Sequence, residues 1–275
     1  MGHRAISNNP LLSNSEFRIG KSLLFLFLDS WIWSQPLIRL HSIFFLSMES
    51  PQLVVFDLAG TTVYDDQDVP RILKMSLEKF RVIITIEDAS RVMGIPKPVA
   101  IGQLLNQYNY PDPPEGLIHQ IHEEFMSTMI RFYQEDSRVK EMPGADRVFS
   151  QIRDRGTRVF VDTGFDRTIT DALLDRLGWV RNNLIDGSVT SEEVDRGRPF
   201  ADMIFRAMEM AGVTDVKRVA KVGDTASDLQ EGTAAGCSWV IGVTTGAYSV
   251  TDLAKEPHTH LAGSLDEVFA ILFPN

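Results

Sequence analysis

The sequence predicts an α/β protein built on a Rossmann-like, doubly wound parallel sheet. Two observations favour this class. The first is a set of short apolar runs, each as long as one buried strand and separated by helical patterns: 52–56, 157–161, 218–222 and 238–243. The second is that three of these runs lead into Asp, or into Asp followed by Thr. Ligands of a doubly wound sheet bind beyond the carboxyl ends of its strands, so these residues stand where chemistry is expected.

The composition is that of an ordinary globular protein of 275 residues, 44% of them hydrophobic, enough for one large domain or two modest ones. The net charge of −10 and the isoelectric point of about 5.1 argue against a nucleic-acid-binding protein. A small anion can still bind, because a pocket can be locally positive on an acidic protein. Cys237 is the one cysteine, which excludes an intrachain disulfide and fits a reducing compartment. Its apolar neighbours predict a buried structural thiol.

The first 47 residues differ from the rest of the chain. Apolar stretches such as 22–28 are interrupted by charged residues and proline, and none reaches the roughly 18–20 apolar residues that a membrane span needs. Three interpretations stay open. The segment is a dispensable extension upstream of Met48, a targeting segment with Arg18 and Lys21 before its apolar part, or a docked structural element.

Residues 58–156, between the first and second apolar runs, are too many for a simple crossover. Their patterns predict several helices, at about 69–80, 98–108, 115–135 and 144–154. We assign the last of these helices to the core and the others to a helical cap domain inserted after the first strand. The predicted boundaries are an extension at 1–47, an α/β core at 48–64 and 143–275, and the cap at 65–142.

The first strand leads into the string DLAGTT, which begins at Asp57. A carboxylate at a strand end, followed by glycine and two threonines, fits a nucleophile with a tight backbone turn around it. The alternative is that Asp57 only caps or stabilises a turn.

The third strand leads into KVGDTASDLQEG, in which Asp224 and Asp228 are four residues apart. If a helix starts near Thr225, both carboxylates face the same end of the sheet. Several carboxylates close together suit a hard divalent cation such as Mg²⁺. The alternative is that the acidic residues complement the dipole of a helix N-terminus.

Two further segments offer groups that could bind an anion. In VDTGFD, Thr163 provides a hydroxyl and Gly164 allows the backbone to approach an anion closely, whereas Asp162 and Asp166 are interpreted as capping or turn residues. Arg198 precedes a proline and a helix expected at 200–212, where its guanidinium could donate two hydrogen bonds to phosphate oxygens.

The candidate residues follow one another along the chain in one order: Asp57, Thr163, Arg198, Asp224 and Asp228. This order resembles that of the haloacid dehalogenase superfamily, which has a nucleophilic Asp, then Ser or Thr, then a basic residue, then an acidic metal pair. The resemblance covers about residues 50–273 and implies that the chain is a hydrolase. It also implies an inserted cap that closes over the site.

The resemblance assigns roles to these residues. Asp57 would be the catalytic nucleophile, and Thr163 and Arg198 would act with it on the transferring phosphoryl group. The implied ligands of Mg²⁺ are Asp57, the carbonyl of Ala59, Asp224 and, close by, Asp228. The implied phosphate-binding residues are Gly60, Thr61, Thr163, Gly164 and Arg198.

Ala59 points to one branch of the superfamily. Most of its phosphatases have a second Asp at this position as general acid, whereas DLAGTT resembles the phosphonatase branch, which has Ala there. That branch forms a Schiff base between a cap lysine and an aldehyde substrate. The segment RVMGIPKPVAI resembles the phosphonatase cap, and Lys97 falls at the place of the reactive lysine. The alternative is a solvated cap lysine. A histidine that assists proton transfer in phosphonatase is Ala100 here.

We therefore expect a magnesium-dependent hydrolase that acts on a phosphonate or small organophosphorus substrate through an aspartyl-phosphate intermediate. Two alternatives stay open: a phosphate monoester phosphatase of the same superfamily, and a catalytically weak binding or regulatory protein with this fold. No nucleic-acid partner and no membrane span are expected of the folded domain. A homodimer and a cytoplasmic location are further expectations.

Overall fold

The computed structural model describes residues 50–110 and 113–274. The chain separates into two units, Met1–Met48 and Glu49–Asn275, and the described residues all belong to the second. The interpretations of residues 1–47 therefore lie outside the described residues. Among the described residues, no helix has the length and apolar character that crossing a membrane requires.

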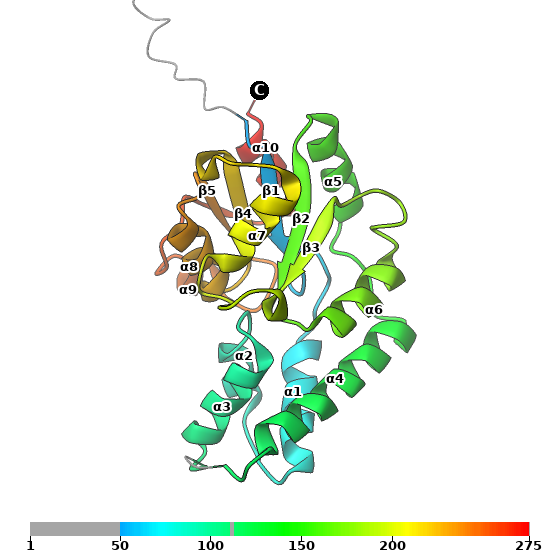
Figure 1. Ribbon diagram of the computed structural model, residues 1–275, viewed down its shortest axis with the longest axis vertical. Helices are drawn as coiled ribbons and strands as arrows, with labels where there is room; N and C mark the ends of the chain where they lie inside the picture. The colour runs from blue at the N-terminus through cyan, green and yellow to red at the C-terminus, as the bar shows by residue number, and fades with distance from the viewer. Residues whose placement is uncertain (1–49, 111–112, 275) are drawn as a thin grey trace, which may run out of the picture. The chain divides into compact units, whose positions relative to one another are not determined.

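The centre of the fold is a parallel sheet of six strands in the order β3-β2-β1-β4-β5-β6 (Figure 1). Its strands are β1 (Leu53–Asp57), β2 (Arg158–Thr163), β3 (Gly187–Thr190), β4 (Val219–Gly223), β5 (Trp239–Val243) and β6 (His260–Ala262). The chain runs outward from β1 to β3 and then returns to β4, which is the doubly wound topology. The predicted fold class is thus confirmed. The two edge strands β3 and β6 were not predicted, because they have only four and three residues and no apolar run.

Both faces of the sheet are covered by helices, which explains why the strands read as continuous apolar runs. Val54 and Phe56 of β1 belong to the core under α5 and α10, whereas Leu53 and Val55 belong to the core under α7 and α8. The helices outside the insertion are α5 (Ala145–Asp154), α6 (Arg167–Leu177), α7 (Asp202–Ala211), α8 (Ala226–Ala235), α9 (Val250–Leu253) and α10 (Leu265–Leu272), with short 3₁₀ helices at Ser191–Glu193 and Val216–Arg218.

Between β1 and α5 the chain forms a helical insertion, which lies below the sheet in Figure 1. It consists of α1 (Asp68–Lys79), α2 (Ile86–Arg91), α3 (Lys97–Gln107) and α4 (Leu117–Glu135). Three of these were predicted; α2 was missed because it has only six residues. Helix α4 packs against α1 and α3 and also against α6 of the core. The boundaries 65–142 and the role of the insertion as a cap stay predictions.

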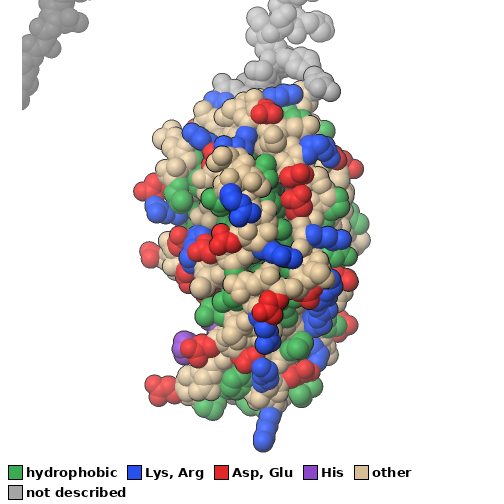
Figure 2. All heavy atoms as spheres, turned by 90° about the vertical axis from the view of Figure 1, so that its right-hand side faces the viewer, with side chains coloured by type: hydrophobic (Ala, Val, Ile, Leu, Met, Phe, Trp, Pro, Cys, Tyr) green, Lys and Arg blue, Asp and Glu red, His purple; other side chains and the backbone are tan. Residues whose placement is uncertain are grey.

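The face of the protein that Figure 2 shows carries Lys and Arg side chains intermixed with Asp and Glu. Exposed side chains of opposite sign form ion pairs in the described part of the chain, for example Arg147 with Asp266. Such exposed pairs contribute little to stability. This mixture of signs on an acidic chain gives no support to a nucleic-acid-binding surface on that face.

Candidate active site

The carboxyl ends of β1, β2 and β4 meet beside one cavity. Asp57 pairs in register with Asp162 on β2, and β4 ends one residue before Asp224. The cavity is lined from the core and from the helical insertion by Asp57, Ala59, Asp65, Val69, Met93, Gly94, Lys97, Thr163, Gly164, Phe165, Arg198, Asp224, Thr225 and Ala247. Segments that are far apart in the sequence thus place Asp57, Lys97, Thr163, Arg198 and Asp224 around the same space, as the sequence predicted.

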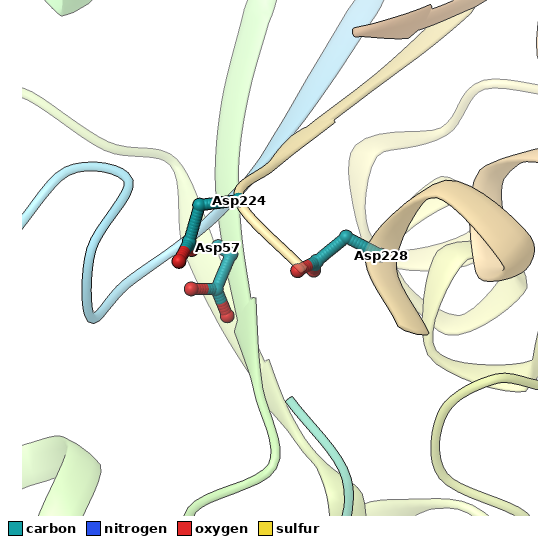
Figure 3. A group of neighbouring side chains, drawn as sticks. All are labelled: Asp57, Asp224 and Asp228. Carbon is teal, nitrogen blue, oxygen red and sulfur yellow. The ribbon is translucent and has the colours of Figure 1, made fainter. Parts of the chain in front are cut away.

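Asp57, Asp224 and Asp228 form an acidic cluster (Figure 3). One carboxylate oxygen from each residue lies within 4.8 Å of the other two. The Thr61 hydroxyl and the Ala247 N–H hold Asp224 in place, at 2.8 Å from Oδ1 and 2.7 Å from Oδ2. Asp228 caps α8: its Oδ2 accepts from the N–H of Thr225 at 3.1 Å, and the Thr225 hydroxyl donates to it as well. Buried, oriented oxygen ligands of this kind fit a hard divalent cation.

The electrostatics of the cluster also fit a cation. Burial raises the pKa of Asp57 to about 6, against the lowering effect of Arg198. Burial and the neighbouring carboxylates of Asp57 and Asp228 raise the pKa of Asp224 well above its usual range. Adding negative charge here is costly in the metal-free protein, and a divalent cation would offset that cost. Metal binding would then release a proton.

This arrangement predicts that Asp224→Asn has opposite effects with and without metal. In chelator the variant should be at least as stable as the parent, because it removes a carboxylate that burial disfavours. With Mg²⁺ at about 100 times its dissociation constant, the parent should gain about 2.7 kcal/mol and the variant should gain little. Thermal unfolding with and without Mg²⁺ checks this, with exposed Asp175→Asn as the control. Equal stabilisation of the parent protein and of Asp224→Asn by Mg²⁺ would contradict the assignment of the site.

Arg198 lies at the centre of the buried charges. Arg198 lies four residues before α7, in the turn that precedes the helix and not at the helix start. The predicted helix start at residue 200 is two residues too early. Its guanidinium donates to Asp57 Oδ1 at 2.6 Å, to Glu231 Oε2 at 3.0 Å and to the Asp162 backbone carbonyl at 2.8 Å. Asp228 Oδ1 lies 3.0 Å from the same group. It also pairs with the Asp162 carboxylate, so the guanidinium links the nucleophile candidate to the carboxylates of Glu231, Asp228 and Asp162.

Three further buried charges were missed or misread in the sequence. Asp162 was interpreted as a capping or turn residue, and this is wrong: it is fully buried at the end of β2 and pairs with Arg198 and Lys221. Although burial acts to raise the pKa of Asp162, these two cations hold it below its usual range. Lys221 also lies 3.0 Å from Glu231. The signal for Lys221 was a lysine inside the apolar run RVAKV, where a buried cation needs buried carboxylates.

Gly60 and Thr61, in the turn after β1, lie against Asp224 and not against the cavity. Gly60 has φ of +90°, and a Cβ there would lie 2.6 Å from Asp224 Oδ2, so a side chain would disturb the cluster. The N–H groups of Gly60 and Thr61 donate to the Val63 and Leu58 carbonyls, and the Thr61 hydroxyl donates to Asp224. Neither Gly60 nor Thr61 lines the cavity. Phosphate binding by these two residues, which the resemblance implied, therefore stays a prediction without geometric support.

Thr163 and Gly164 line the cavity, as expected. The Thr163 oxygen accepts from the Phe165 N–H at 3.2 Å, which leaves its proton available to a ligand. At Gly164 a Cβ would lie 2.9 Å from the Ile95 carbonyl, so this glycine permits close contact between the loop after β2 and the helical insertion. The neighbouring Asp166 occupies the N-cap position of α6 but uses its carboxylate to pair with His122, at 2.9 Å.

Lys97 is the first residue of α3 and is only 3% exposed, which excludes the alternative of a solvated lysine. Its Nζ lies 5.7 Å from the ring centroid of Phe125 and 5.3 Å from that of Phe165. Burial lowers the pKa of Lys97 to about 8, although Asp57 acts to raise it. Lys97 therefore has the features of a nucleophilic amine: it is desolvated and faces the cavity that contains Asp57.

The doubly wound sheet thus has an acidic cluster at its strand ends, beside buried Arg198 and the desolvated Lys97 of the helical insertion. The family model for haloacid dehalogenase-like hydrolases matches residues 51–236, and the chain belongs to this family. It is 32% identical over 207 residues to a phosphonoacetaldehyde hydrolase of Bacillus cereus, covering 71% of this chain and 76% of that protein. The phosphonoacetaldehyde hydrolase of Bacillus cytotoxicus is 31% identical over 219 residues, covering 74% and 80%.

Solved structures share the fold. A phosphonoacetaldehyde hydrolase-like protein from Oleispira antarctica superposes with a TM-score of 0.69 at 20% identity, covering 81% of this chain and 92% of that one. A hydrolase from Pseudomonas syringae superposes with a TM-score of 0.72 at 17% identity, covering 80% and 97%. These structures confirm the doubly wound α/β fold, and the family model and the phosphonoacetaldehyde hydrolase relatives confirm the prediction of a hydrolase.

Proposed function

We propose that this hydrolase cleaves the carbon–phosphorus bond of a small phosphonate that carries an aldehyde, through an aspartyl-phosphate intermediate. The observation that carries the proposal is the placement of Lys97: a buried amine with a pKa of about 8 lines the same cavity as Asp57. A metal-assisted phosphatase reaction needs no such amine. The relatives named phosphonoacetaldehyde hydrolase support the proposal.

Lys97 would make the carbon a better leaving group. With a pKa of about 8, about one lysine in ten is neutral at pH 7, compared with about one in 3,000 at an ordinary pKa of 10.5. The neutral amine adds to the aldehyde carbon and loses water to give an imine. When the carbon–phosphorus bond breaks, its electron pair moves into the protonated imine and forms an enamine. An aliphatic carbanion is thereby avoided.

Asp57 would accept the phosphoryl group. A carboxylate oxygen attacks phosphorus as carbon leaves, and water then hydrolyses the acyl phosphate to release inorganic phosphate. Arg198, which donates to Asp57 at 2.6 Å, would bind phosphoryl oxygens beside the nucleophile, together with the hydroxyl of Thr163, which lines the same cavity. Ala59 also lines the cavity and provides no acid for an alkoxide leaving group, which a C–P cleavage does not require.

The cofactor of this reaction would be Mg²⁺. The Asp57 and Asp224 carboxylates and the Ala59 carbonyl would hold it, with Asp228 close by. When bound, the ion would offset negative charge on the phosphoryl oxygens and keep Asp57 ionised. The helical insertion would act as the cap, excluding water from the cavity that its residues Lys97 and Met93 line together with the core.

The test is a panel of phosphonates and phosphate esters, assayed with Mg²⁺ on the parent protein and on Lys97→Arg. Arginine keeps the positive charge but forms no imine under these conditions, so phosphate release from an aldehyde phosphonate should fall at least about 10³-fold. Borohydride added with this substrate should trap an adduct on Lys97. The trapping rate should rise with pH up to about 8, because the reactive neutral amine replaces the ammonium form over this range.

Lys74→Arg on α1 is the matched control, since Lys74 is partly exposed, lies outside the cavity and pairs with Glu78 on the same helix. Two outcomes would favour the alternatives that the sequence left open. Ester hydrolysis that survives Lys97→Arg but not Asp57→Asn would indicate a phosphate monoester phosphatase. No magnesium-dependent phosphate release from any substrate would indicate a binding or regulatory protein. The homodimer and the cytoplasmic location stay predictions.

A further inference from the structure

One carboxylate in the cavity belongs neither to the acidic cluster nor to the partners of Arg198. Asp65 lies between β1 and α1 and lines the cavity together with Lys97. Its Oδ1 accepts from the backbone N–H groups of Asp68, at 2.7 Å, and Val69, at 3.2 Å, in the first turn of α1. These bonds fix the side chain through one oxygen. No contact within the described residues engages its second oxygen, Oδ2.

Imine formation requires a proton donor near the reacting amine. The addition product of an amine and an aldehyde loses its hydroxyl as water only after that oxygen is protonated. Helix α3 offers no such donor close to Lys97, because the residue one turn later is Ala100, which is fully buried. The donor must therefore come from another element that lines the cavity.

The other carboxylates of the cavity are engaged elsewhere. Asp57 accepts from Arg198, and Asp224 accepts from Thr61 and from the Ala247 N–H. Among the described residues that line the cavity, Asp65 is the remaining titratable acid.

We propose that Asp65 transfers the protons of the imine chemistry at Lys97. The inference rests on the proposed function and adds a catalytic residue to it. In the forward direction, the Asp65 carboxyl gives its proton to the hydroxyl of the addition product, which leaves as water while the carbon–nitrogen double bond forms. After the carbon–phosphorus bond breaks, the enamine carbon takes a proton from solvent water, which gives the protonated imine of the product. In the final hydrolysis, the Asp65 carboxylate takes a proton from the water that adds to this imine. Each turnover thus returns Asp65 to its protonated state.

The surroundings of Asp65 favour this role. Burial raises the pKa of Asp65, and the neighbouring Asp68 carboxylate acts in the same direction, against the N–H groups of Val69 and Asp68 and the charge of Lys97. Asp65 therefore retains its proton to a higher pH than an exposed aspartate, which suits a group that must give and regain it. The charge that develops on the imine nitrogen would then face a carboxylate.

The experiment compares Asp65→Asn with the parent protein by timed borohydride trapping with phosphonoacetaldehyde, and the Lys97 adduct is quantified by mass spectrometry. Asparagine keeps an oxygen that can accept from the N–H groups of Asp68 and Val69, so α1 should keep its start. The trapping rate should fall about 10²-fold or more, which is the usual contribution of a general acid–base residue. Added formate should restore part of the rate, because a small acid can replace the missing carboxyl. Exposed Asp66→Asn, one residue away, should keep the parent rate.

Asp65→Ser, which keeps a capping oxygen but no carboxyl, provides a second variant if Asp65→Asn folds poorly. Trapping at the parent rate in a folded Asp65 variant would overturn the assignment of Asp65 and leave the proposed function standing. No adduct in the parent protein would instead overturn the proposed function, and the role of Asp65 with it.

Discussion

Asp57→Asn is expected to lower phosphate release by at least about 10³-fold while leaving the fold as stable as before or more stable. An amide of the same shape keeps an oxygen that can accept from Arg198, which donates to Asp57 Oδ1 at 2.6 Å. It lacks the negative oxygen that would attack phosphorus. If Asp57 had only a structural role, Asp57→Asn would instead lower the stability of the fold and phosphate release together.

The stability part of this prediction depends on pH. Burial raises the pKa of Asp57 from 3.8 to about 6 in the metal-free protein. A raised pKa means that ionised Asp57 destabilises the fold, by about 3 kcal/mol at most, at pH values above about 6. In chelator at pH 7, Asp57→Asn should therefore be the more stable protein. The difference should shrink as the pH falls through 6 and vanish below about 3.8, where Asp57 is protonated in both states.

Phosphate release with Mg²⁺ and denaturant unfolding at pH 7 and pH 4 in chelator measure the two effects separately. Asp175→Asn, on the exposed side of α6, serves as the control for a surface aspartate and should change neither quantity. Phosphate release by Asp57→Asn within tenfold of the parent rate would exclude Asp57 as the nucleophile.

The fold and half of the candidate site were predictable because parallel strands bring their carboxyl ends to one edge. Asp57, Thr163 and Asp224 follow apolar runs, so the sheet topology alone places them together, and their distances to one another follow from strand spacing. The short edge strands β3 and β6 have no apolar run that a sequence pattern could detect. Their place at the edges is set by tertiary pairing with β2 and β5.

The environment of Lys97 could not be read from the sequence. Its position was predicted only through a resemblance, and its burial depends on Phe125 of α4 and Phe165 of the loop after β2, which come from distant segments. The same limit applies to Asp65, which no motif of the sequence singles out. What makes each group chemically distinct is desolvation by residues that only the folded chain brings near.

Arg198→Met is expected to cause the largest loss of stability of any single change in the buried charge cluster. The substitution removes the guanidinium that contacts Asp57, Asp228 and Glu231 at 2.6 to 3.0 Å and also pairs with Asp162. Lys221 then remains paired with Asp162, Asp228 and Glu231, but it forms no ion pair with Asp57. Breaking a buried ion pair by removing one partner typically costs about 3–5 kcal/mol, because the other charge stays buried without compensation.

For a folded unit of this size the loss corresponds to a decrease of roughly 6–20 °C in the midpoint of thermal unfolding. Arg198→Lys should lose less stability, because it keeps the charge, but a compact ammonium group cannot contact all of these partners at once. Arg198→Lys should still lose most phosphate release, because lysine lacks the two parallel N–H donors with which a guanidinium would bind phosphoryl oxygens. A comparison of the two variants therefore separates the structural effect of the charge from the catalytic effect of the guanidinium shape.

The neighbouring Arg196 provides a stringent control for this prediction. Arg196 is exposed, pairs with Asp202 at 2.9 Å and lies 4.7 Å from the ring centroid of Phe200. Arg196→Met makes the same chemical change two residues away, and it should leave both the unfolding midpoint and phosphate release unchanged within error. If Arg198→Met were as stable as Arg196→Met, the carboxylates around Arg198 would have to be protonated in the folded protein. In that case the raised pKa values of Asp57 and Glu231, about 6 and about 8, would dominate the site, and its binding of a divalent cation would become strongly dependent on pH.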